Sequence, residues 1–411
     1  MERGHSTVIA LLSVMIFPAL AMAQSVVILN EIEILGESDI GIEGVAYSPD
    51  DGIVIAHGAG SAVFIIDSAS PENNTRIEAP GNISLLAASF HPGGKSALLV
   101  GEDGEVLRLI LSNFSFESSG GSSTFGETQL NAVSWNGDGS WSYIGGEEGW
   151  IWRFRGIENG GIEAIPIENR GTSDINAISC LRSSNVCIVS TDFDGIGIID
   201  ENHELIWIGG FEHPWVDVEC NSISDFECIS ISSDLTIARI TVNAVDASQT
   251  EIYDNDFVQL QGFEGSMTGI EPQWGGNNLI SMAPFGLIEH DSGMGKSFHW
   301  LDNVDAVDFD VGISGERIVG TWGTAPFEGW IVTDRGSIVS FDLSGRENDG
   351  SMLEIWIGVI ILGGTTLMLI SLLTSSSPKM SRWITKKIGS DEERRSAIKE
   401  ERRLLRKKGR A

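Results

Sequence analysis

Short apolar runs alternate with polar turn residues along most of this chain. Two examples are SALLVGEDGEVLRLIL, which begins at residue 96, and WSYIGGEEGWIWRFR, which begins at residue 141. In each, an apolar run ends in a turn containing Gly, Asp or Glu, and a second run follows at once. Runs of about five to seven residues joined by such turns predict β-hairpins.

The hairpin pattern recurs at a regular spacing. The strand that precedes each turn reads, in order, GVAYSPDDG, AASFHPGG, AVSWNGDG, AISCLRSS, DVECNSIS, GIEPQWGG and AVDFDVGISG. If Tyr47, Phe90, Trp135, Cys180, Cys220, Pro272 and Phe309 occupy equivalent positions, the mean spacing is about 44 residues, the period of propeller blades. The fold class expected is therefore all-β, a β-propeller with seven four-stranded blades, six or eight being alternatives.

Three segments depart from this repeat. Residues 26–35, VVILNEIEIL, precede the first unit and are expected to supply the outer strand of the last blade, which would close the ring and remove a free edge. Residues 112–126 are rich in Ser and Gly and indicate a loop or an outer edge. The seventh unit holds an extra strand-like piece, ERIVGTW, interpreted as an insertion or a partial further blade.

The strand pattern and the period resemble those of WD40-like β-propellers over residues 26–343. The Gly-His and Trp-Asp dipeptides of that family are absent from the repeats, so its hydrogen-bonded tetrad is not carried over. The resemblance implies a ring of blades that presents many loops and binds other molecules.

The two ends of the chain predict a membrane topology. Residues 1–23 combine an apolar run with Ala21-Met22-Ala23, the form of a cleavable signal peptide, with an uncleaved anchor as the alternative. Residues 355–373 are 19 residues without a charge, enough to cross a membrane. We therefore expect a signal peptide (1–23), an extracytoplasmic propeller (24–352), a transmembrane helix (353–374) and a cytoplasmic basic tail (375–411).

Charge is distributed very unevenly. The whole chain has 26 basic and 58 acidic residues, but residues 24–352 hold 51 acidic and only 12 basic ones. Such a surface repels nucleic acid. The tail is basic, which places it in the cytoplasm by the positive-inside rule, and its segment 390–410 is expected to form a helix near anionic lipid headgroups.

Four cysteines form two local pairs, each flanking a short polar loop between strand-like runs. We expect disulfides between Cys180 and Cys187 and between Cys220 and Cys228. A zinc site is the alternative, although the spacings are wider than zinc ligands usually show. Three sequons for possible glycosylation lie at Asn73, Asn82 and Asn113.

No catalytic motif appears in the sequence. The seven histidines lack metal-ligand spacing, and Asp192-Phe193-Asp194-Gly195 is a fragment of a calcium loop whose better interpretation is a tight turn. The twelve tryptophans are expected to pack mostly between blades, with a sugar-stacking or quinone-docking face as the alternative. We therefore expect no cofactor and no metal.

These features favour a cell-membrane, single-pass protein whose propeller lies outside the cell. Its expected function is non-catalytic, as a binding scaffold with a protein partner at the propeller face. The alternatives are an extracytoplasmic hydrolase or cofactor enzyme with an axial site, and a component that assembles envelope complexes.

Overall fold

The computed structural model describes residues 26–36, 40–48, 52–157, 161–220, 226–243, 245–302, 312–313, 315–343 and 382–409 without 384 and 388. The chain divides into two compact units, Met1–Ser344 and Gly345–Ala411. The predicted signal peptide and transmembrane segment both lie outside the described residues. Within the described part, no helix has the length and apolar character needed to cross a membrane.

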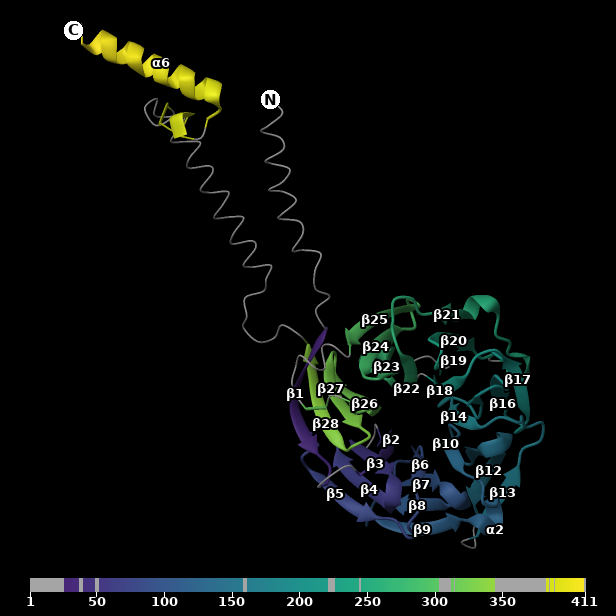
Figure 1. Cartoon of the computed structure of the whole chain (residues 1–411). Coiled ribbons are helices and arrows are strands. Elements are labelled where there is room, and N and C mark those ends of the chain that lie inside the picture. The colour runs from purple at the N-terminus through teal and green to yellow at the C-terminus, as the bar shows by residue number, and fades with distance from the viewer. Residues whose placement is uncertain are drawn as a thin grey trace. The chain divides into compact units, whose positions relative to one another are not determined.

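The first unit is a seven-bladed β-propeller of four-stranded antiparallel sheets, as the repeat predicts (Figure 1). The strands nearest the axis are β2 (Ile42–Ser48), β6 (Leu85–Phe90), β10 (Leu130–Trp135), β14 (Ile175–Cys180), β18 (Trp215–Cys220), β22 (Ser266–Pro272) and β26 (Ile318–Ala325). The second strands are β3 (Ile53–Gly58), β7 (Ser96–Gly101), β11 (Ser142–Gly146), β15 (Cys187–Thr191), β19 (Glu227–Ser232), β23 (Asn278–Ala283) and β27 (Glu328–Thr333).

The outer half of each blade has two further strands. The third strands are β4 (Ala62–Asp67), β8 (Val106–Ile110), β12 (Ile151–Gly156), β16 (Ile196–Ile199), β20 (Thr236–Thr241), β24 (Gly286–Asp291) and β28 (Ser337–Leu343). The outermost strands are β5 (Asn74–Glu78), β9 (Ser115–Gly120), β13 (Ile162–Pro166), β17 (Leu205–Gly209), β21 (Phe257–Gln259), β25 (Lys296–Leu301) and β1 (Val27–Ile34).

The last blade combines both ends of the propeller sequence. β1 pairs antiparallel with β28, from Val27 opposite Leu343 to Ile34 opposite Ser337. The expectation that residues 26–35 supply the outer strand of the last blade is thereby confirmed. This closure leaves no blade with a missing strand, so opening the ring requires breaking a complete ladder.

One detail of the repeat needs correction, and for a second the structure decides between two alternatives. The inner strand of the seventh blade is β26, so the piece interpreted as an insertion is the regular strand, and the equivalence at Phe309 is wrong. Position 309 itself lies outside the described residues. The Ser-rich segment 112–126 contains the outer strand β9 and the short helix α2 (Ser122–Phe125), so its interpretation as an outer edge is the correct alternative.

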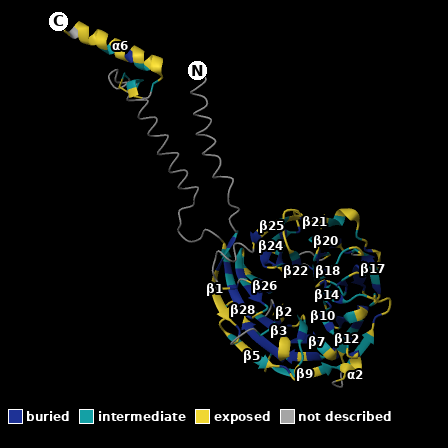
Figure 2. Ribbon diagram, in the orientation of Figure 1, coloured by how far each residue is buried: buried dark blue, intermediate teal, exposed yellow. Residues whose placement is uncertain are grey.

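The apolar core lies between neighbouring blades. One cluster joins Leu98 and Val100 of β7 to three residues of the next blade, Val133, Ile144 and Trp152. Burial falls from the middle of each blade to its rim: β7 is buried throughout, whereas β5 and β9 are largely exposed or half-buried (Figure 2). Trp215 and Trp300 are almost wholly buried, which agrees with the expectation that tryptophans pack between blades.

The second unit contains one long helix among its described residues, α6 (Asp391–Lys408). Ser390 and Glu393 form a capping box, and Asp391, Glu392 and Glu393 occupy the first turn, where negative charge favours the positive end of the helix dipole. The predicted helix of the basic tail is therefore present. Its proximity to lipid headgroups stays a prediction.

Candidate functional site

The seven inner strands share one irregularity, and it places equivalent side chains around the axis. In each blade the pairing of the inner strand with the second strand shifts after the first residue of the inner strand, or after the second residue in β22. The residue directly after this bulge is small in six blades, namely Gly44, Ala87, Ala132, Ala177, Gly269 and Gly320, and is Asp217 in β18. A Cβ at Gly320 would lie 2.0 Å from Cγ2 of Val45, so neighbouring inner strands approach closely there.

In blade 5 the residue after the bulge is Asp217, and its carboxylate is hydrogen-bonded to the next blade. One carboxylate oxygen accepts a hydrogen bond from the backbone N–H of Val218 at 2.8 Å, and the other accepts one from Ile270 in β22 at 2.9 Å. Burial raises the pKa of Asp217 to about 6, although these two hydrogen bonds oppose the rise. Asp217 therefore joins blades 5 and 6 and leaves a carboxyl of high proton affinity beside the axis.

Two residues after this position, blades 5 and 6 carry a glutamate where the first four blades carry a small residue. Ala46, Ser89, Ser134 and Ser179 occupy this level in the first four blades, whereas β18 has Glu219 and β22 has Glu271. Burial and then the Asp217 carboxylate raise the pKa of Glu219 to about 8, with partial opposition from the Arg182 guanidinium. Burial, Asp217 and Glu219 together raise the pKa of Glu271 well above its ordinary value.

Two cavities occupy the axis. We name the larger one, of about 370 Å³, the axial mouth; residues of β2, β6, β10, β14, β18 and β22, together with the turns that follow these strands, line it. The smaller one has about 260 Å³ and lies toward the beginnings of the inner strands. Val45, Ala88 and Glu271 line both cavities, so Glu271 stands where the two meet.

One side of the axial mouth is aromatic, and the other side carries carboxyl groups. Tyr47, Phe90 and Trp135 line it from the first three blades, and Glu219 and Glu271 line it from blades 5 and 6. Tyr47 is 40% exposed, and the buried indole Nε1 of Trp135 has no partner within the described residues. The mouth therefore offers aromatic surface and carboxyl groups to one ligand.

Both disulfides border this mouth. Cys180 is bonded to Cys187, and Cys220 to Cys228, across the first hairpins of blades 4 and 5, as expected from the sequence. Cys180 and Cys220 line the mouth, and the backbone N–H of Cys220 donates to Ser179 Oγ at 3.0 Å. The bonds hold these two hairpins closed where Glu219 and Arg182 approach the cavity.

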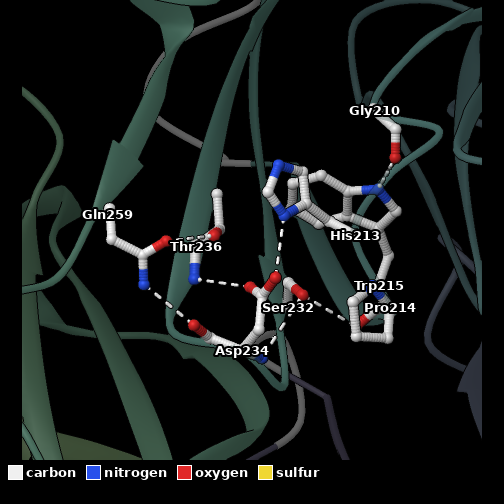
Figure 3. Close-up of polar contacts among 8 residues, drawn as sticks. All are labelled: Gly210, His213, Pro214, Trp215, Ser232, Asp234, Thr236 and Gln259. Atoms are coloured by element: carbon white, nitrogen blue, oxygen red, sulfur yellow. Dashed lines mark hydrogen bonds and ion pairs between the residues drawn. The ribbon is translucent and has the colours of Figure 1, made fainter.

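A histidine, an aspartate and a serine meet in blade 5 without forming a nucleophilic site (Figure 3). His213 Nδ1 lies 2.8 Å from Asp234 Oδ2, but the hydroxyl of Ser232 is buried and donates to the Pro214 carbonyl at 2.9 Å. Asp234 also accepts from the Thr236 N–H at 3.1 Å. The network therefore fastens the turn after β19 to the segment before β18.

The other residues singled out from the sequence have structural surroundings. Asp194 accepts hydrogen bonds from the backbone N–H groups of Thr172 and Ser173, so it holds a turn of the neighbouring segment. Asn73, Asn82 and Asn113 are exposed, and their glycosylation stays a prediction. Over the described residues, no group of three or more His, Cys, Asp and Glu side chains has an arrangement suited to a metal ion.

Sequence reasoning missed Asp217, Glu219 and Glu271. The available signal was the level of the repeat that they occupy, because the equivalent positions in the first four blades carry Gly, Ala or Ser. Comparison with known proteins adds no assignment: no protein-family model matches the chain, and no curated protein matches it. The class that the fold itself defines is the seven-bladed β-propeller, a fold consistent with the WD40-like resemblance.

Proposed function

We propose that this protein is a membrane-anchored, cell-surface β-propeller that acts as a non-catalytic binding scaffold, and that the axial mouth holds part of its protein partner. The observation that carries this proposal is the mouth itself, a cavity of about 370 Å³ lined from six blades by aromatic, carboxyl and hydroxyl groups. Rigid rings that place side chains from separate blades around one cavity suit binding.

The carboxyl and aromatic groups of the mouth favour a partner with a basic group at its tip. Glu219 and Glu271 have no hydrogen-bond partner for their carboxyl groups within the described residues, while Tyr47 and Phe90 face the same cavity. An ammonium or guanidinium group gains from an aromatic face, and its positive charge would lower the raised pKa values of the two glutamates and bind the carboxylates that form. Arg182 is exposed and lines the same mouth, so it is the charge that such a partner would displace from Glu219.

Affinity capture tests the scaffold role. Full-length protein with a tag at the tail is captured from gently solubilised native membranes at native salt, and the accompanying proteins are identified by mass spectrometry. A partner in stoichiometric amount supports the proposal. Recovery of the protein alone, at several salt concentrations, contradicts it.

The membrane anchor and orientation need a separate experiment. The proposal places the propeller outside the cell and the basic tail in the cytoplasm, because residues 355–373 are uncharged and the tail has 13 basic residues against 5 acidic ones after residue 378. Protease added to intact cells should remove an epitope in the propeller and spare one at the tail. Loss of both epitopes from intact cells contradicts this topology.

A second candidate function, an extracytoplasmic enzyme with an axial site, is favoured by one observation. Glu219 has a pKa of about 8 and lines a cavity, as a general acid at neutral pH does. A panel of hydrolase substrates tested on the wild type and on Glu219→Gln distinguishes the two. Activity that Glu219→Gln abolishes favours the enzyme, and equal signals from both proteins favour the scaffold.

A further inference from the structure

A third cavity lies on the flank of the ring between blades 3 and 4, away from the axis. Its volume is about 320 Å³, and we name it the flank cavity. Arg153 of β12 lines it together with residues 165–169, which end β13 and follow it, and residues 202–204, which belong to the turn after β16. None of these residues lines either axial cavity.

Arg153 is placed toward blade 4 by strand register. It pairs with Tyr143 of β11 and with Ile165 of β13, and directly opposed residues share one face of a sheet. Its guanidinium lies 5.1 Å from the ring of Trp141, within cation–π range. Within the described residues the Arg153 side chain has no ion pair and no hydrogen bond, whereas its neighbour Arg155 is paired with Glu163 at 2.6 Å.

His203 is held in one orientation beside Arg153. The hydroxyl of Tyr143 lies 2.7 Å from His203 Nδ1, and the imidazole meets the edge of Trp141 at a ring distance of 5.2 Å. Burial and the nearby guanidinium of Arg153 lower the pKa of His203, and burial raises that of Tyr143. The Tyr143 hydroxyl therefore donates to Nδ1 of a neutral ring, which leaves Nε2–H as a donor without a partner in the described structure.

The polar side chains of the flank cavity differ in burial. Arg153 and His203 are half-buried, whereas Glu168, Glu204 and the amide of Asn202 are exposed. A ligand that enters therefore meets hydrogen-bond donors at depth and acceptor-only carboxylates at the rim. This order suits a molecule with one carboxylate at one end and hydroxyl groups at the other.

We propose that the flank cavity binds a sugar that carries a carboxylate, namely a uronic acid residue. The planar guanidinium of Arg153 takes the carboxylate in a two-point contact, His203 Nε2–H donates to a ring or hydroxyl oxygen, and Glu168 and Glu204 accept from hydroxyl groups. A polyanion with charge along its whole length meets repulsion from the two rim glutamates. The free sugar and the same residue within a polysaccharide share this chemistry.

The test is titration of purified full-length protein with D-glucuronate, followed by calorimetry, with D-glucose, acetate and L-glutamate as comparison ligands. Saturable binding of glucuronate, at least tenfold tighter than that of the other three, is the expected result. A disaccharide that links one glucuronate to a neutral sugar separates the two sources: tighter binding than the monomer indicates a polysaccharide, and equal binding indicates the free sugar. Equal binding of glucose, tighter binding of glutamate, or no saturable binding of glucuronate overturns the proposal.

Matched variants assign the contact. Arg153→Gln should weaken glucuronate binding at least tenfold, while Arg155→Gln, on the same strand and against the same tryptophan, should change it less than twofold. A loss of similar size in both variants would show a general charge effect and overturn the assignment. Circular dichroism confirms that each variant is folded, and the axial variant Glu219→Gln should bind glucuronate like the wild type.

Discussion

Glu219 makes the stability of the propeller depend on pH in a direction opposite to that of ordinary surface carboxylates. Its pKa rises from 4.5 to about 8 in the folded protein. Because the folded state holds this proton more tightly, the group stabilises the fold fully below pH 4.5, and that stability is lost as pH rises through 8. At about 1.4 kcal/mol for each factor of ten in proton affinity, the whole effect is about 5 kcal/mol, of which about 3 kcal/mol falls between pH 5 and pH 8.

The perturbation is Glu219→Gln, which keeps the shape of the side chain and removes its titration. Unfolding by urea, followed by tryptophan fluorescence in mild detergent at a series of pH values, gives the free energy of unfolding of each protein. From pH 5 to pH 8 the wild type should lose about 3 kcal/mol more than the variant. The surface variant Glu72→Gln, which removes one exposed charge, should follow the wild type.

A constant difference in the free energy of unfolding between wild type and variant would contradict this pH dependence. If the free energies of wild type and Glu219→Gln run parallel from pH 5 to pH 8 within about 0.5 kcal/mol, Glu219 is solvated and its proton affinity is ordinary. The axial mouth would then present a charged carboxylate at neutral pH. The candidate role of Glu219 as a general acid would fail with it.

Three further predictions concern the scaffold. Replacing both Cys220 and Cys228 with alanine should lower the free energy of unfolding by about 2 kcal/mol, since the closed loop is short; a urea midpoint unchanged from that of the wild type would contradict this. Leu29→Ala, in the buried face of β1, should cost about 2 to 4 kcal/mol in the same assay, and a cost below about 0.5 kcal/mol would show that ring closure contributes little. Changing the asparagine of each of the three exposed sequons to glutamine should raise electrophoretic mobility in protein from the native host, and identical mobility in all variants would indicate that none is glycosylated.

The propeller could be predicted because its information is local and repeated. Strand runs and turns recur about every 44 residues, so even weak strand signals reinforce one another over several blades. The outer strand at residues 26–35 was predictable because a run with no repeat of its own, at the start of a ring, has only the last blade to complete. Both disulfides followed from hairpin register, which sets Cys180 opposite Cys187 and Cys220 opposite Cys228.

The errors have a physical cause as well. In the seventh unit two apolar segments compete for the role of inner strand, and the repeat alignment favoured the one that precedes a turn containing Asp and Gly. The structure uses β26, whose pairing runs from Ile318 opposite Thr333 to Ala325 opposite Glu328. Pairing with β27 decides between such segments, and that contact is not a property of either segment alone.

The site was harder to predict than the fold because it is assembled across blades. Asp217, Glu219 and Glu271 are ordinary acidic residues in a very acidic sequence, and their raised proton affinities arise from burial beside one another at the axis. The flank cavity is similar, since Arg153 and His203 meet only through the packing of blade 3 against blade 4. The spacing of residues within a single strand or turn predicts neither the axial carboxyl cluster nor the proximity of Arg153 to His203.

Quantitative capture from native membranes with three proteins tests whether the axial mouth engages a protein partner. These are the wild type, the mouth variant Tyr47→Ala/Glu219→Gln, and Tyr253→Ala as an exposed aromatic control that does not line the mouth. We expect one stoichiometric partner with the wild type and the control, and at least a fivefold smaller amount with the mouth variant. Equal recovery of the partner with all three proteins, or no partner with any of them, would contradict it.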